Sequence, residues 1–149
     1  MVLFAVLSFI LAGCSDSGAE SGPSENPPVA STAPKESATA AIAWITDYQQ
    51  GIDQARLQNK PALIVFTTTW CPPCLMMKEK VYPDPKVVRA VEDFIPIMID
   101  PDYEKELAQK FNVTGIPAFF ILGPDGKQIA SFVGYHEPDE FIAQLKSRL

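Results

Sequence analysis

The sequence predicts an α/β fold in which a mixed four-stranded sheet carries helices on both faces. Segments with apolar residues at helical spacing alternate with short runs rich in branched and aromatic residues. The predicted order is helix, strand, helix, strand, helix, strand, strand, helix. This order gives a right-handed βαβ unit followed by a ββα unit, with an extra helix at the amino-terminal end. A chain of 149 residues has room for one such domain.

The first half of the domain begins with a helix and a buried strand. Apolar residues at helical spacing predict a first helix that ends near Gln58: Ile45, Tyr48, Ile52 and Ala55. The run 62–69 is rich in Ile, Val, Phe and Thr, which favours a strand. Residues 75–81 predict a helix whose first turn holds Pro72 and Pro73, where a missing N–H costs nothing. Cys71 therefore falls at a strand-to-helix junction.

The middle of the domain predicts further helix at 86–93 and a strand at 94–99. Pro96 lies within that strand, so we expect it at an edge of the sheet. Tyr103, Leu107 and Phe111 recur at helical spacing and predict another helix, with Asp102 as its N-cap. Asp102 is thus expected to have a structural role.

The last part of the domain predicts a hairpin and a helix. A strand at 118–122 follows Pro117, and the turn 123–126 leads into a second strand at 127–133. A final helix runs from Pro138 to about Arg148 and is expected to bury Phe141, Ile142 and Leu145.

The amino-terminal sequence is typical of an export signal. An apolar run from Val2 to Ala12 is too short to cross about 30 Å of hydrocarbon, which takes roughly twenty helical residues. The sequence from Leu11 to Cys14 resembles the lipobox of bacterial lipoproteins. This resemblance implies a signal peptide at 1–13 and a lipid anchor on Cys14, and it leaves the other two cysteines as one pair. The alternatives are an ordinary cleaved signal and a core helix, and no Lys or Arg precedes the run.

The segment 14–41, which begins with Cys14, is expected to be a disordered tether. It is rich in Ser, Ala, Gly, Pro, Glu and Thr and has no aromatic residue. The folded domain is then expected at 42–149. The lipobox resemblance implies a place in the bacterial cell envelope, facing the periplasm or the cell exterior. Ser15 after the cysteine slightly favours the outer membrane.

Cys71 and Cys74 carry the predicted chemistry. Cysteines three positions apart in the first turn of a helix can close a small disulfide ring. The free N–H groups and partial positive charge of a helix N-terminus favour thiolate over thiol. We expect an exposed Cys71 to attack a substrate disulfide and a more protected Cys74 to resolve the mixed disulfide. This exchange needs no metal or organic cofactor.

The motif Trp70-Cys71-Pro72-Pro73-Cys74 and the later Gly115-Ile116-Pro117 resemble the thioredoxin superfamily over almost all of 42–149. Within it, the domain is most similar to the soluble domain of the transmembrane thiol:disulfide interchange reductases and to thioredoxin-like lipoproteins. The resemblance implies that Pro117 is cis and faces the cysteine pair, that the backbone of Ile116 pairs with substrate, and that Trp70 shields the disulfide. It also implies a reductase of protein disulfides that a membrane electron donor recharges.

Two positions depart from the thioredoxin pattern. Val65 stands where thioredoxins carry a buried Asp, and Pro96 stands where they carry its Lys partner. The usual proton acceptor for the buried thiol is therefore missing. Water, Glu79 or another acid is left to take this role.

Other functions remain as alternatives. A zinc site needs four ligands, and beyond Cys71 and Cys74 the domain offers only the single His136, which we expect at the surface. Met76 and Met77 leave open a copper chaperone, although methionines there more often fill the core. A redox-inactive binding module on the same fold is also possible. A net charge of −6 without a basic patch argues against nucleic-acid binding, and we expect a monomer.

Overall fold

The computed structural model describes residues 41–148, which all belong to one compact unit, Glu36–Leu149. The predicted signal peptide, lipid anchor and most of the tether lie outside the described residues. The helices are α1 (Tyr48–Gln58), α2 (Pro72–Met76), α3 (Pro85–Val91), α4 (Lys105–Lys110) and α5 (Pro138–Lys146), and a π-helical turn, η1 (Met77–Val81), continues α2. The strands are β1 (Ala62–Phe66), β2 (Ile95–Ile99), β3 (Ala118–Leu122) and β4 (Gln128–Val133).

The strands form one mixed sheet in the order β2-β1-β3-β4. β1 runs parallel to β2 and antiparallel to β3, and β3 pairs with β4 as an antiparallel hairpin. The predicted βαβ and ββα units are confirmed, and β2 with its Pro96 lies at an edge of the sheet as expected.

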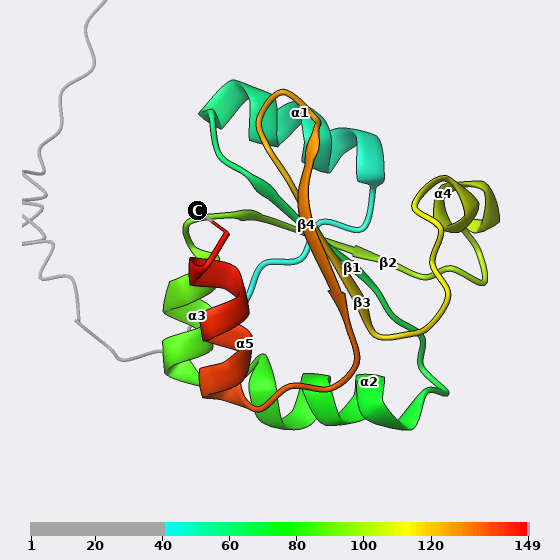
Figure 1. The fold of residues 1–149 in the computed structure, drawn as a ribbon, viewed down its shortest axis with the longest axis vertical. Helices are drawn as coiled ribbons and strands as arrows, with labels where there is room; N and C mark the ends of the chain where they lie inside the picture. The colour runs from blue at the N-terminus through cyan, green and yellow to red at the C-terminus, as the bar shows by residue number, and fades with distance from the viewer. Residues whose placement is uncertain (1–40, 149) are drawn as a thin grey trace, which may run out of the picture. The chain divides into compact units, whose positions relative to one another are not determined.

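Helices cover both faces of the sheet (Figure 1). α1 and α4 lie on one face, while α2, α3 and α5 lie on the other. Alternate residues of β1 supply the two cores: Leu63 and Val65 face α3 and α5, and Ile64 and Phe66 face α1 and α4. All five residues of β1 are buried, which explains its continuous apolar run in the sequence.

Local chemistry sets the ends of α1. The Asp47 carboxylate accepts a 2.7 Å hydrogen bond from the N–H of Gln50 and caps the first turn. Asn59 ends the helix in the left-handed conformation, at a φ of 51°. Ile45 was expected in this helix but precedes it. Its backbone instead pairs with the edge strand, since its N–H donates to Pro96 O and its carbonyl accepts from Met98 N.

Boundaries elsewhere also differ from the sequence prediction. The strand expected at 62–69 ends at Phe66, and Thr67 to Thr69 form a loop that leaves the sheet. α4 begins at Lys105 with Glu104 before it, so Asp102 is not its N-cap. In α5, Phe141 and Leu145 are buried as expected, but Ile142 is only half-buried at the edge of the core.

Candidate functional site

Cys71 and Cys74 form a disulfide at the start of α2. Cys71 has extended backbone dihedrals and occupies the N-cap position, with Pro72 and Pro73 at the first helical positions. The N–H of Leu75 donates a 3.0 Å hydrogen bond to the carbonyl of Cys71, which closes the first turn. Because Pro72 and Pro73 have no N–H, the expected placement of the prolines removes no helical hydrogen bond.

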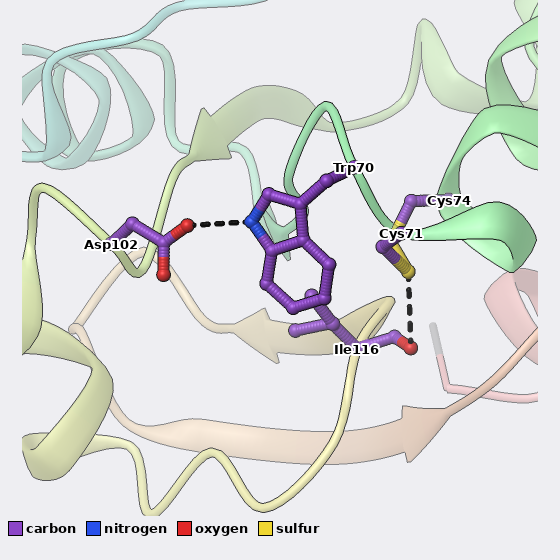
Figure 2. The surroundings of a disulfide bond; sticks show 5 residues. All are labelled: Trp70, Cys71, Cys74, Asp102 and Ile116. Carbon is purple, nitrogen blue, oxygen red and sulfur yellow. Dashed lines mark hydrogen bonds between the residues drawn. A yellow bond between two sulfur atoms is a disulfide. The ribbon is translucent and has the colours of Figure 1, made fainter.

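Both cysteines are buried in this disulfide form. Cys71 is 3% exposed and Cys74 is fully buried. The sequence analysis expected an exposed Cys71, and this is wrong for the disulfide. The neighbouring loop that carries Ile116 lies against the sulfur: Sγ of Cys71 is 3.6 Å from the carbonyl oxygen of Ile116 (Figure 2). Cys74 remains the more protected of the two sulfurs, as expected.

The Ile116–Pro117 peptide bond is cis, as the thioredoxin resemblance implies. The loop before Pro117 brings the Ile116 carbonyl to Cys71, and Pro117 leads into β3. The N–H of Gly134 donates a 2.8 Å hydrogen bond to the carbonyl of Pro117. Gly134 has a φ of +99°, a conformation that favours glycine, so the end of β4 is fastened to this loop.

Trp70 lies beside the disulfide with 66% of its surface exposed. Its indole Nε1 donates a 2.8 Å hydrogen bond to Oδ2 of Asp102, so the indole lies between Asp102 and the cysteine pair (Figure 2). The N–H of Asp102 in turn donates to Oδ1 of Asp100. Sequence reasoning missed this role of Asp102. The available signal was its place just after β2, because the carboxyl ends of the parallel strands β1 and β2 meet at one edge.

The position of the usual buried acid holds no ionisable group here. Val65 is fully buried in the core with Leu63, Met77 and Val81. Glu79, a candidate substitute, lies exposed on η1. The side chain of Val65 supports the sheet by packing, and it can neither accept nor deliver a proton.

Among the other ionisable groups, Tyr82 is buried, Tyr135 is hydrogen-bonded and His136 is largely covered. Burial raises the pKa of Tyr82 well above its ordinary value of 10.0. Tyr135, beside Gly134, donates a 2.8 Å hydrogen bond to Glu137, and this bond raises the pKa of Tyr135. His136 was expected at the surface but is only 19% exposed, with its ring 5.3 Å from that of Phe132.

A metal site needs several ligand side chains close together. Within residues 41–148, no three or more His, Cys, Asp or Glu side chains gather closely enough to hold a metal ion. Met77 is fully buried in the core, whereas Met76 is 36% exposed. In the same part of the chain, no helix is both long and apolar enough to cross a membrane.

Comparisons with known proteins agree with this geometry. A family described as a thioredoxin-like domain matches residues 48–148. The thiol:disulfide interchange protein DsbD of Pseudomonas fluorescens is 28% identical over 105 residues, which cover 68% of this chain and 18% of that protein. Mitochondrial thioredoxin-3 of Saccharomyces cerevisiae is 35% identical over 77 residues, covering 52% of this chain and 58% of the relative. This chain thus spans about a fifth of the first relative and just over half of the second.

A solved structure extends the likeness to the fold. The oxidised C-terminal domain of DsbD from Neisseria meningitidis aligns with a TM-score of 0.62 and 24% identity, covering 72% of this chain and all of that domain. The family match covers the whole cysteine site, including Cys71, Cys74 and Pro117. The chain therefore belongs to the thioredoxin-like domain family, and it has the fold and the Cys-x-x-Cys disulfide of a thiol-disulfide oxidoreductase.

Proposed function

We propose that this protein reduces protein disulfides outside the cytosol by dithiol-disulfide exchange at Cys71 and Cys74. The observation that carries the proposal is the Cys71–Cys74 disulfide at the start of a helix, with the loop before a cis proline directly against it. A pair of cysteines that forms a disulfide in a folded domain can accept two electrons when the bond opens to the dithiol and give them up when it forms again.

The exchange begins with the reduced protein. The Cys71 thiolate attacks one sulfur of a substrate disulfide and forms a mixed disulfide, and the other substrate sulfur leaves as a thiolate. The Cys74 thiolate then attacks Cys71 Sγ, which releases the second substrate thiolate and leaves the Cys71–Cys74 disulfide. Protons lost by the two cysteines balance those gained by the two substrate sulfurs. We propose no metal or organic cofactor for these steps.

Each cysteine has surroundings suited to its proposed role. Cys71 is at the N-cap of α2, where the helix N-terminus favours its thiolate. Cys74 lies one turn inside and is fully buried, so a bulky substrate reaches Cys71 first. Because Val65 replaces a carboxyl group, Cys74 must lose its proton to water or to a surface acid such as Glu79.

The substrate contacts are proposed from the same loops. An extended substrate segment would pair with the backbone of Ile116, whose carbonyl lies 3.6 Å from Cys71 Sγ. Such pairing recognises main chain more than side chain and suits a range of protein disulfides. Trp70, with most of its indole exposed, offers an apolar surface beside the disulfide.

The location of the protein is part of the proposal. The Leu11–Cys14 motif supports a signal peptide at 1–13 and a lipid anchor on Cys14, and the composition of 14–41 supports a tether. So anchored, a monomeric domain would face the periplasm or the cell exterior, and Ser15 slightly favours the outer membrane. A membrane protein would return electrons to Cys71 and Cys74. Cys14→Ala should abolish incorporation of labelled fatty acid and release the protein from membranes. The control Cys71→Ser should still incorporate the fatty acid and stay attached to membranes.

A redox titration of the purified domain tests the direction of electron flow. We expect a potential within about 50 mV of the roughly −270 mV of thioredoxins, together with reduction of insulin disulfides. A potential near about −120 mV, typical of a strong oxidant, would overturn the reductase assignment. Copper bound after purification, with no insulin reduction, would favour the copper chaperone, and neither property would favour a redox-inactive module.

A further inference from the structure

The helix formed by α2 and η1 buries one of its faces, and a lysine lies on that face. The residues of this helix without exposed surface recur at positions i, i+3 and i+7, the spacing of a core-facing stripe: Cys74, Met77 and Val81. Lys78 fills position i+4 of the same stripe and is half-buried, whereas Lys80 is exposed. A charged residue thus stands where helix periodicity calls for an apolar one.

The ammonium of Lys78 has no partner that explains this place. Lys60 is the other half-buried lysine of residues 41–148, and its ammonium donates a 3.0 Å hydrogen bond to the carbonyl of Glu92. Within the same residues, no hydrogen bond or ion pair joins the Lys78 ammonium to another group. Partial burial of an unpaired charge costs free energy, so the position indicates a use for the charge.

Helix geometry brings Lys78 close to Cys74. Residues four apart in a helix are neighbours on one face, with about 5–6 Å between their Cβ atoms. Met76 and Met77, which lie between the two, have right-handed helical dihedrals, so the turn is continuous. Helical side chains lean toward the N-terminus of their helix. The side chain of Lys78 is therefore expected to cover the turn that holds Cys74.

The surroundings of Lys78 agree with this direction. Lys78 and Met98 line two adjoining hollows, one of about 330 Å³ with mainly apolar walls and one of about 280 Å³ that residues 67–69 also line. A lysine in such a place keeps its carbon stem against the apolar groups and its ammonium on the more polar side. Residues 67–69 lead directly into Trp70 and Cys71, so the ammonium lies toward the redox pair.

The other groups around this helix face offer Cys74 no second cation. In the core, β1 supplies Val65, and α5 supplies Phe141 and Leu145, all without charge. The titratable groups that line the two hollows with Lys78 are Tyr82, Asp100, Tyr103 and Glu104. The two carboxylates oppose the ammonium, and the variants below measure the balance. Among these groups Lys78 is the one cation.

We propose that the ammonium of Lys78 stabilises the thiolate of Cys74, which makes Lys78 a positioning residue for the resolving step. The inference deepens the proposed exchange and rests on it. In this step Cys74 gives its proton to water, and its thiolate attacks Cys71 Sγ. The bond from Cys71 to the substrate sulfur breaks, and that sulfur leaves with the electron pair. A cation beside a thiol raises its ionised fraction, so Lys78 compensates for Val65, which cannot accept the proton.

The ionisation of Cys74 tests the proposal directly. Full-length chains carry Cys14→Ala and Cys71→Ser, which leaves Cys74 as the single cysteine of the three, and the NMR signal of its isotope-labelled Cβ is followed as the pH rises. Lys78→Gln and Lys78→Met remove the charge and should raise the midpoint by about 0.5 pH unit or more, while Lys78→Arg keeps it and should change the midpoint by less than about 0.2 unit. Lys80→Gln, exposed on η1, is the matched control and should leave the midpoint unchanged. Equal midpoints in Lys78→Gln, Lys78→Met and Lys80→Gln would overturn the proposal.

The rate of the resolving step gives a second readout, in chains with Cys14→Ala and both redox cysteines. One equivalent of a disulfide whose thiolate absorbs visible light releases a first thiolate when Cys71 attacks and a second when Cys74 resolves. At pH 7 the second phase should be about twofold slower in Lys78→Gln, because an about threefold lower thiolate fraction is partly offset by a more nucleophilic thiolate. Above both midpoints the difference should vanish or reverse. A variant slower by one factor at every pH would show a merely structural role and overturn the proposal.

This inference and the proposed exchange can fail separately. The titration uses no substrate, so equal midpoints would remove the role of Lys78 and leave disulfide exchange untouched. A shifted midpoint together with no second thiolate from the chain with an unaltered Lys78 would overturn the exchange itself, and with it the part of Lys78 in resolution.

Discussion

The indole of Trp70 and the carboxylate of Asp102 are joined by a 2.8 Å hydrogen bond across 32 positions of the sequence. The bond connects the loop after β1 with the loop after β2, at the edge of the sheet where the disulfide lies. A hydrogen bond from an indole N–H to a carboxylate is charge-assisted, which makes it stronger than one between neutral groups. It fixes a large exposed side chain beside the cysteine pair.

Replacing Asp102 by Ala should loosen Trp70 and slow exchange with protein disulfides. The loss of an exposed hydrogen bond of this kind corresponds to about 1 kcal/mol, or roughly a fivefold fall in kcat/KM if the bond supports the transition state. Insulin reduction and the fluorescence anisotropy of Trp70, in a Trp44→Phe background, measure the two effects. Asp102→Asn keeps an acceptor oxygen, so its kcat/KM and anisotropy should lie between those of the unaltered protein and Asp102→Ala. An unchanged kcat/KM in Asp102→Ala would show that the bond does not position Trp70 for exchange.

Removing the hydroxyl of Tyr82 should stabilise the protein. The side chain is 6% exposed, and its hydroxyl has no hydrogen-bond partner within residues 41–148. An unpaired buried hydroxyl costs about 1–3 kcal/mol, so Tyr82→Phe should raise the free energy of unfolding at pH 7 by about 1 kcal/mol. Denaturant unfolding of the oxidised domain measures this difference. A less stable variant would indicate that the hydroxyl has a partner.

The difference in stability between the unaltered protein and Tyr82→Phe should depend on pH. Burial raises the pKa of Tyr82 in the folded protein above 10.0, the ordinary value that applies to the unfolded chain. The raised pKa of Tyr82 therefore leaves the stability of the unaltered protein undiminished below pH 10. As the pH rises from there toward the folded pKa, the free energy of unfolding falls by up to about 1.4 kcal/mol per pH unit. The advantage of Tyr82→Phe should grow between pH 10 and 11. A constant difference across this window would contradict the raised pKa.

Gly51 marks a close approach of α1 to the edge strand. A Cβ at this position would overlap the side chain of Ile97, which is fully buried in β2. Gly51→Ala should therefore lower the free energy of unfolding by about 1–2 kcal/mol, because overpacking outweighs the better helix propensity of alanine. In a double-mutant cycle with Ile97→Ala, the double variant should lose less free energy of unfolding than the sum of the losses in the two single variants. Strict additivity would mean that the two residues do not press on each other.

Much of the fold could be predicted from the sequence because the pattern that encodes it is local. The apolar run of β1 and the hairpin of β3 and β4 needed no knowledge of distant residues. Ile45 shows the limit: its spacing fits a helix, yet its backbone bonds to β2. Thr67 to Thr69 have strand-forming side chains, but the sheet ends at Phe66 and these residues turn toward the loop of Asp100.

The site shows the same division between local and distant information. The positions of Cys71 and Cys74 at a helix start follow from the adjacent strand and prolines. The burial of Cys71 and the role of Asp102 depend on segments about 30 to 45 residues away, which local patterns do not report. His136 was expected at the surface because its loop sequence does not report the rings that pack against it, which include Phe119 of β3, 17 positions earlier, as well as the nearby Phe132.

The central claim is that Cys71 attacks and Cys74 resolves. It is tested most directly by incubating the reduced Cys74→Ser protein with a disulfide-bonded protein and resolving the products by mass spectrometry without reductant. We predict a stable mixed disulfide through Cys71 and none with the matched Cys71→Ser variant. Equal trapping by both variants, or no adduct with Cys74→Ser, would contradict the account.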